Sequence, residues 1–195
     1  MDDHATTVPA GTATPDARHA LAPNQLLIGL RIVANVVANR VRKLEMANLA
    51  AVGSIALALR LPPFEIALRC AFAFLLNALV YLHNDYVDVE RDLASPNKDA
   101  SIARYLADNR RAAVYAQLLL LGMLAAGALS YDPGLFVPLI AASVICLWYS
   151  AQAKYMAGWD VVATTVGGVA MTLCGTPVTN HVGWLMTLQL GFFSG

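Results

Sequence analysis

The stretch at residues 81–92, YLHNDYVDVERD, places oxygen-bearing side chains where a long apolar run ends. Asn84, Asp88 and Asp92 recur every four residues. On a helix each step of four drifts by only about 40°, so these side chains share one face. Mg²⁺ prefers oxygen ligands, and proteins usually hold it through one or two carboxylates together with substrate phosphates and water. The spacing therefore predicts a Mg²⁺ and diphosphate site; the alternative is a solvated loop beside the membrane.

Two further polar residues lie close to this pattern. Asp85 belongs to the same acidic stretch, and Asn77 extends the Asn84 face back into the preceding apolar run. An amide inside a membrane helix either bonds a neighbouring helix or reaches a substrate, and the sequence leaves both roles open. We therefore include Asp85 and Asn77 as possible members of the site.

A second polar segment, WYSAQAKYMAGWD at residues 148–160, follows a later apolar run. Lys154 there could neutralise a phosphate oxygen, and the Tyr149 hydroxyl could donate a hydrogen bond to one. Lys154 also suits a different role, as a cation that orients the neighbouring helices in the membrane. Asp160 is another possible site residue, although the helix dipole also favours an acid in the first turn of a helix.

The composition is that of an integral membrane protein. Of the 195 residues 58% are hydrophobic, and 13 basic side chains balance 13 acidic ones. Between residues 112 and 195 only Asp132, Lys154 and Asp160 are charged, far below the roughly one residue in four of an average soluble domain. The neutral balance and the lack of a basic block with interleaved aromatics exclude nucleic acid as a predicted partner.

Hydrophobic periodicity predicts an all-α, multi-pass transmembrane bundle. Crossing the hydrocarbon core takes roughly 20 mostly apolar residues, and we expect five full spans and a partial sixth that begins near Val182. The five expected spans lie near residues 45–61, 65–83, 111–130, 134–151 and 159–177.

Two segments precede the first expected span. Residues 1–23 are polar and rich in Ala, Thr and Pro, which predicts a disordered tail. Residues 24–44 have helical periodicity and are either an interfacial helix, basic side toward anionic headgroups, or the amphipathic start of the first span. The expected apolar face of this helix consists of Leu26, Leu30, Val33, Val37 and Val41, and the polar face of Arg31, Asn35, Asn39 and Arg42.

Basic residues predict the orientation in the membrane, because Lys and Arg concentrate in cytoplasmic loops. They gather before the first expected span, between the second and third, and between the fourth and fifth. The connections on the other side, at residues 60–65, 130–134 and 176–181, are short and poor in positive charge. The N-terminus and the loops that carry the predicted site are therefore expected to be cytoplasmic.

The run NDYVDVERD at residues 84–92 resembles the first aspartate-rich motif, N-x-x-x-D-x-x-x-D, of the UbiA-type intramembrane prenyltransferase superfamily. The run YSAQAK at residues 149–154, followed by Asp160, is similar to the stretch that this family carries after its fourth span. The resemblance implies a helical bundle of about nine spans. In such a bundle a prenyl group moves from a Mg²⁺-bound polyprenyl diphosphate to an aromatic or other lipid-soluble acceptor.

The resemblance also implies roles by motif position. Asn84, Asp88 and Asp92 would bind Mg²⁺ and diphosphate, with Asp88 and Asp92 as the catalytic residues, and Lys98, Tyr149 and Lys154 would contact the diphosphate.

The resemblance covers about the first two thirds of the family fold. Relatives carry a second aspartate-rich motif after the sixth span, so the transmembrane domain at residues 45–195 is expected to be C-terminally incomplete. It would be a fragment, a partner of a second chain that supplies the missing helices, or a protein that has lost catalysis. The chain by itself is expected to be inactive. The main alternative to an enzyme is a membrane scaffold or binding protein with a cytoplasmic acidic loop.

Overall fold

The protein is built from helices throughout the part that the structure describes. The structure is a computed structural model that describes residues 23–43, 45–96 and 100–194, and it contains no strand there. The α-helices are α1 (Pro23–Arg42), α2 (Asn48–Ala58), α3 (Pro63–Val87), α4 (Val89–Ala94), α5 (Ser101–Asp108), α6 (Arg110–Ser130), α7 (Phe136–Ala151), α8 (Trp159–Thr172) and α9 (His181–Ser194). Three 3₁₀ turns are η1 (Pro133–Leu135), η2 (Ala153–Tyr155) and η3 (Leu173–Gly175). The all-α fold class is confirmed.

Three helical segments in the described part of the chain are long and apolar enough to cross a membrane. They are Pro63–Val87, Arg110–Ser130 and Pro133–Tyr155, which match the second, third and fourth expected spans. The first and fifth expected spans are shorter apolar helices, Asn48–Ala58 and Trp159–Gly175. With its 11 residues, α2 is about 16 Å long, roughly half of a 30 Å hydrocarbon core.

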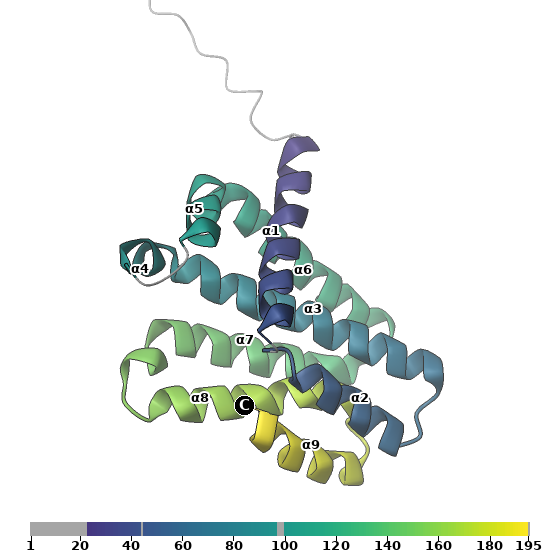
Figure 1. Cartoon of the computed structure of the whole chain (residues 1–195). Coiled ribbons are helices and arrows are strands. Elements are labelled where there is room, and N and C mark those ends of the chain that lie inside the picture. The colour runs from purple at the N-terminus through teal and green to yellow at the C-terminus, as the bar shows by residue number, and fades with distance from the viewer. Residues whose placement is uncertain (1–22, 44, 97–99, 195) are drawn as a thin grey trace, which may run out of the picture.

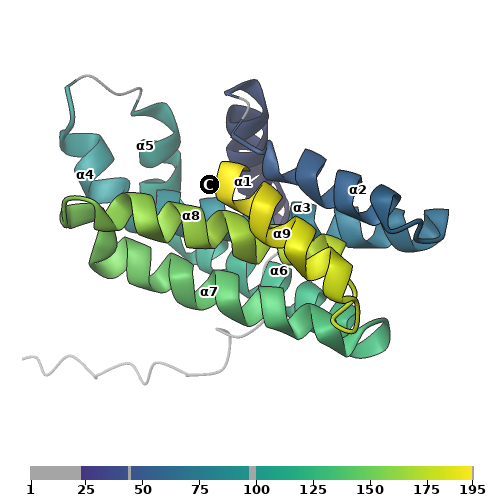
Figure 2. The same ribbon diagram turned by 90° about the horizontal axis from the view of Figure 1, so that it is seen from below.

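The long helices lie side by side, and their packing makes two apolar clusters. In both views α3, α7 and α8 run along the same direction, with α2 and α9 beside them (Figures 1 and 2). One cluster lies among these helices and includes Phe72, Leu76 and Leu139. The other lies where α1 meets α3 and α6, and Ile32 and Val36 enter it from α1. The two clusters fix the positions of α3 and α7, which carry the candidate site.

The expected helix at residues 24–44 is present as α1, but only part of its expected apolar face packs against the fold, since Val33 and Val37 are partly buried there. The buried side chains are those of Ile32 and Val36. Three members of the expected apolar face, Leu26, Leu30 and Val41, are exposed. In Figure 1 α1 runs across α3 instead of along it, and Figure 2 looks nearly along the axis of α1. The tail expected at residues 1–23 lies outside the described residues except for Pro23, which begins α1.

A buried arginine ties together the end of the bundle where α3 begins. The side chain of Arg69 is 2% exposed, and its guanidinium donates to three acceptors. Nη2 lies 2.6 Å from Oδ2 of Asp132, Nε lies 3.0 Å from Oε1 of Glu65, and Nη1 lies 3.2 Å from the carbonyl oxygen of Cys174. These bonds join α3 to the connection between α6 and α7 and to η3, so we call them the Arg69 cluster.

Candidate functional site

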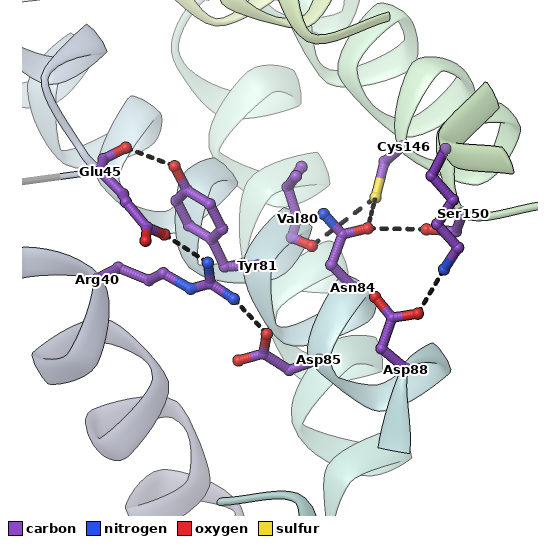
Figure 3. A network of polar contacts seen from close by, with 10 residues as sticks. Arg40, Glu45, Val80, Tyr81, Asn84, Asp85, Asp88, Cys146 and Ser150 are labelled. Atoms are coloured by element: carbon purple, nitrogen blue, oxygen red, sulfur yellow. Dashed lines mark hydrogen bonds and ion pairs between the residues drawn. The ribbon is translucent and has the colours of Figure 1, made fainter. Parts of the chain in front are cut away.

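The predicted acidic motif lies where α3 ends and α4 begins. The backbone amide of Asp88 donates to the carbonyl of Asn84 at 3.0 Å, and that of Asp92 donates to the carbonyl of Asp88 at 2.8 Å. Helical hydrogen bonds thus continue across the boundary at Asp88, where the helix axis turns (Figure 1). Asn84 and Asp88 consequently project from the same side of α3 (Figure 3), as their spacing predicts.

Side chains from the second predicted segment meet this motif. The Ser150 hydroxyl donates to Oδ1 of Asn84 at 2.7 Å, and the Lys154 ammonium lies 2.5 Å from Oδ1 of Asp88. The thiol of Cys146 lies 3.8 Å from the same Asn84 oxygen and adds only a weak contact. The side chain of Lys154 is 5% exposed and that of Asp88 is 25% exposed. Packing of α7 against α3 therefore joins residues that are 66 positions apart in the sequence.

A second polar group lies beside the first, on the part of α3 that faces α1 (Figure 3). Arg40 forms ion pairs with Glu45 and with Asp85. Its guanidinium also lies 4.7 Å from the ring centroid of Tyr81, within the range of a cation–π contact. The Tyr81 hydroxyl donates to the backbone carbonyl of Glu45 at 2.5 Å. Asp85, a possible site residue by sequence, thus holds the end of α1 against α3.

The charge of Arg40 is maintained by these neighbours. Burial by itself would lower the pKa of Arg40, but the carboxylates of Asp85 and Glu45 outweigh it and hold the pKa above its ordinary value. Arg40 is therefore a permanent cation that two acidic side chains engage.

A cavity of about 360 Å³ lies between the two polar groups. Its polar lining comes from Arg40, Glu45, Asn48, Asn77, Tyr81, Asn84, Tyr149 and Thr164, and its apolar lining includes Val80, Ile145 and Met171. The volume falls within the range of about 300–1,000 Å³ that is usual for small-molecule sites. The cavity is thus a plausible binding site with polar groups on one part of its wall and apolar side chains on the rest.

Asn77 has the interhelical role that the sequence left open. It is 1% exposed, and its side-chain oxygen accepts a hydrogen bond from Nδ2 of Asn48 at 3.0 Å. Its own amide donates to the carbonyl of Ala73 at 2.9 Å. The same residue also lines the cavity, so these bonds fix the wall of the cavity where α2 begins.

The remaining predicted site residues lie apart from the cavity. Asp160 is exposed in the first turn of α8 and is absent from the cavity lining. Asp92 is close enough to Asp85 for the two carboxylates to interact. Lys98 lies outside the described residues. Asn84 and Tyr149 line the cavity, whereas Asp88 and its partner Lys154 lie beside Asn84 and do not line the cavity themselves.

The donor types around Asn84 suit Mg²⁺. The described residues hold no cluster of three or more His, Cys, Asp or Glu side chains that could bind a metal ion. Asn84 and Asp88 instead supply an amide oxygen and a carboxylate. Proteins usually supply one or two carboxylates to a Mg²⁺ site, and substrate phosphates and water complete it. The residues fit a metal that arrives together with a phosphorylated substrate.

Sequence reasoning missed Arg40, Asn48 and Ser150. Arg40 follows Ile32 and Val36 at intervals of four and so shares the buried face of α1, but the sequence alone does not show that this face is the buried one. A cation in phase with buried apolar residues needs an acidic partner. Ser150 and Asn48 had no signal either, since a single small polar residue in an apolar run is common.

No family model, curated protein or solved structure matches this chain. What the molecule does must therefore be argued from its fold and from the geometry of this site.

Proposed function

We propose that this protein binds the Mg²⁺ complex of a polyprenyl diphosphate and transfers its prenyl group to a lipid-soluble acceptor in the membrane. The observation that carries the proposal is the meeting of Asn84, Asp88 and Lys154 beside a cavity with an apolar wall. An oxygen-rich group with an adjacent cation suits a metal-bound diphosphate, and the apolar wall suits a hydrocarbon chain.

Different residues of this chain would bind the metal ion and the phosphate oxygens. Asp88, Asn84 and Asp92 would hold Mg²⁺, which neutralises charge on a departing diphosphate. Lys154, now paired with Asp88, lies where its ammonium could bind a phosphate oxygen. The Tyr149 hydroxyl could donate a second bond from the cavity wall.

The apolar part of the cavity has a separate task. When the bond between the allylic carbon and oxygen breaks, its electron pair leaves with the diphosphate. The electron-poor carbon must meet the acceptor, which then loses a proton as the new bond forms. Val80, Ile145 and Met171 line the cavity and would keep out water that could capture this carbon first.

The proposal includes an orientation in the membrane. Exposed basic residues lie at the end of the bundle that carries α4, α5 and the start of α6, among them Arg91, Arg104 and Arg111. Because cytoplasmic loops are rich in Lys and Arg, we assign this end to the cytoplasm. In this orientation the three long helical segments would cross the bilayer, and α2, with about half the length of the hydrocarbon core, would enter it only part of the way.

A non-catalytic scaffold is the second candidate, and the ion pairs favour it. Asp85, Asp88 and Glu90 pair with Arg40, Lys154 and Arg110, respectively. Acids that already have partners need no metal to be stable. The scaffold and the transferase therefore differ in whether Mg²⁺ can draw Asp88 away from Lys154.

The test is binding of radiolabelled geranylgeranyl diphosphate to the purified full chain in lipid nanodiscs, with and without Mg²⁺. We expect binding only with Mg²⁺, and we expect Asp88→Asn or Asn84→Ala to weaken it at least about tenfold, since each removes a charge-assisted contact. The matched control is Glu90→Gln, which alters an 83% exposed carboxylate two residues from Asp88 and should leave binding unchanged. Binding that ignores both Mg²⁺ and Asp88→Asn would favour the scaffold.

A further inference from the structure

The helix α1 carries an apolar surface that no described part of the protein covers. Leu26, Leu27, Leu30 and Val41 are 55%, 65%, 54% and 51% exposed. At 100° per residue all four fall within about one third of the helix circumference. The buried residues Ile32 and Val36 lie on another side, against α3 and α6. We call the four exposed residues the outer face of α1.

A polar stripe borders this outer face. Arg31, Asn35 and Arg42 are all exposed and fall together on the helix circumference, beyond Leu27. Lys43 follows directly and is exposed as well. The cation of Arg40, in contrast, is engaged by Asp85 and Glu45. The outward charge of α1 is therefore positive, and it lies along one edge of an apolar surface.

The contacts of α1 place it at one level of the bundle. Gly29 lies against Ala112 and Ala116, in the first two turns of α6. Arg31 lies 5.7 Å from the ring centroid of Tyr105 in α5, and Arg40 pairs with Asp85, which lies in the last turn of α3. All these contacts are at the end of the long helices that carries α4 and α5, where a spanning helix meets the membrane surface.

The direction of α1 indicates how it would lie relative to a membrane. It runs across α3 in Figure 1, while α3 is one of the helices long enough to span a membrane. If α3 crosses the bilayer, α1 must lie close to the membrane plane. A helix in that plane with an apolar face bordered by cations is the form that binds the boundary between acyl chains and anionic headgroups.

We propose that α1 is a membrane-surface anchor whose outer face enters the acyl chains and whose Arg31, Arg42 and Lys43 bind anionic lipid headgroups. The inference concerns lipid contact alone and does not depend on prenyl transfer. Two sides of the same helix are expected to have different surroundings. Residues of the outer face must contact acyl chains, whereas residues of the polar stripe must contact headgroups and water. Ile32 and Val36 must meet neither.

The test is spin labelling of single cysteines in the full chain, in a background that lacks Cys70, Cys146 and Cys174. Labels go to Leu27 and Leu30 on the outer face, to Asn35 on the polar stripe, and to Leu118 as a standard on α6, 58% exposed. The protein is reconstituted in vesicles of phosphatidylcholine mixed with an equal amount of phosphatidylglycerol. Collisions with oxygen report lipid, and collisions with a water-soluble nickel chelate report water.

We expect labels at positions 27 and 30 to collide with oxygen as often as the label at 118, and the label at 35 to collide mainly with the chelate. Chelate access at 27 and 30 would overturn the proposal, because the outer face would then lie in water. Low access to both reagents there would also overturn it, because a second copy or another protein segment would cover the face.

The charges are tested separately in the otherwise unaltered protein. Spin-labelled phosphatidylglycerol and phosphatidylcholine measure which lipid the protein prefers in its surrounding shell. The triple variant Arg31→Gln, Arg42→Gln, Lys43→Gln should reduce the preference for phosphatidylglycerol about fivefold. The control Arg60→Gln, in the connection between α2 and α3 at the other end of the bundle, should leave it unchanged. An unchanged preference in the triple variant would overturn the headgroup assignment.

Discussion

The two ends of α3 carry similar ion pairs in different surroundings. Arg69 at one end and Lys154, packed against the other end, are 2% and 5% exposed, and their acidic partners Asp132 and Asp88 are 26% and 25% exposed. Arg69 donates to three protein acceptors, and neither it nor its partners line the cavity. The pair of Lys154 and Asp88 lies next to Asn84, which does line it.

A buried ion pair does not by itself identify a functional site. The Arg69 cluster satisfies its own groups and joins three segments of chain, which is a structural role. At the other end the ion pair lies next to Asn84, which lines a cavity that a ligand could fill. We therefore expect changes at the Arg69 end to act on stability and changes at the cavity end to act mainly on binding.

The largest effect is expected from Arg69→Met. The substitution leaves Glu65 and Asp132 without their cation, and removing one partner of a buried pair typically costs about 3 kcal/mol or more. We expect the free energy of unfolding in detergent, measured by circular dichroism during denaturation, to fall by about 3 kcal/mol. The control is Arg60→Met, an exposed cation at the same end. A loss below about 1 kcal/mol would mean that the cluster does not hold this end together.

A smaller effect is expected from adding one methyl group near the Arg69 cluster. A Cβ atom on Gly175 would lie 2.7 Å from the carbonyl oxygen of Val52, so Gly175→Ala must push α2 away from η3. We expect the free energy of unfolding to fall by about 1–3 kcal/mol, the usual cost of overpacking. Gly122→Ala is the matched control, because nothing lies within 4 Å of the added atom and alanine favours a helix. An equal response of both variants would show that this end is not closely packed.

The smallest effect on stability is expected from Lys154→Gln. The glutamine amide can still donate to Asp88, whose carboxylate is exposed enough to be hydrated, so we expect the free energy of unfolding to fall by only about 1 kcal/mol. Binding of geranylgeranyl diphosphate with Mg²⁺ should weaken at least about tenfold, because a charge-assisted contact to phosphate is lost. If stability fell as much as in Arg69→Met while binding were unaffected, the two ends of α3 would have the same structural role.

The sequence predicted the elements of the fold better than their contacts. The three long apolar runs became α3, the helix α6 and the segment that contains α7, because length and hydropathy are properties of each run alone. The run at 159–177 ends as a helix at Thr172 and tightens into η3 before the Thr176–Pro177 pair. The faces of α1 could not be assigned, because periodicity identifies apolar sides without saying which neighbour covers them.

The candidate site was predicted only in part, because a local sequence pattern does not show which neighbours a residue contacts. Residue type and spacing were enough to place Asn84 and Asp88 on one side of a helix. The contacts of Ser150 and Lys154 with these residues depend on how α7 packs against α3, which no local pattern contains. The Mg²⁺ and diphosphate assignments remain predictions, and the binding experiment tests them.

The pairing of Glu65 with Arg69 bears on how this protein enters the membrane. The two residues are four positions apart near the start of α3, with the acid first, the favourable order for such a pair on a helix. A lone arginine costs about 3 kcal/mol when a helix moves into lipid. Because Glu65 accompanies Arg69 on the same helix, α3 would carry this arginine into a membrane already paired with an acid, independently of Asp132, which comes later in the chain.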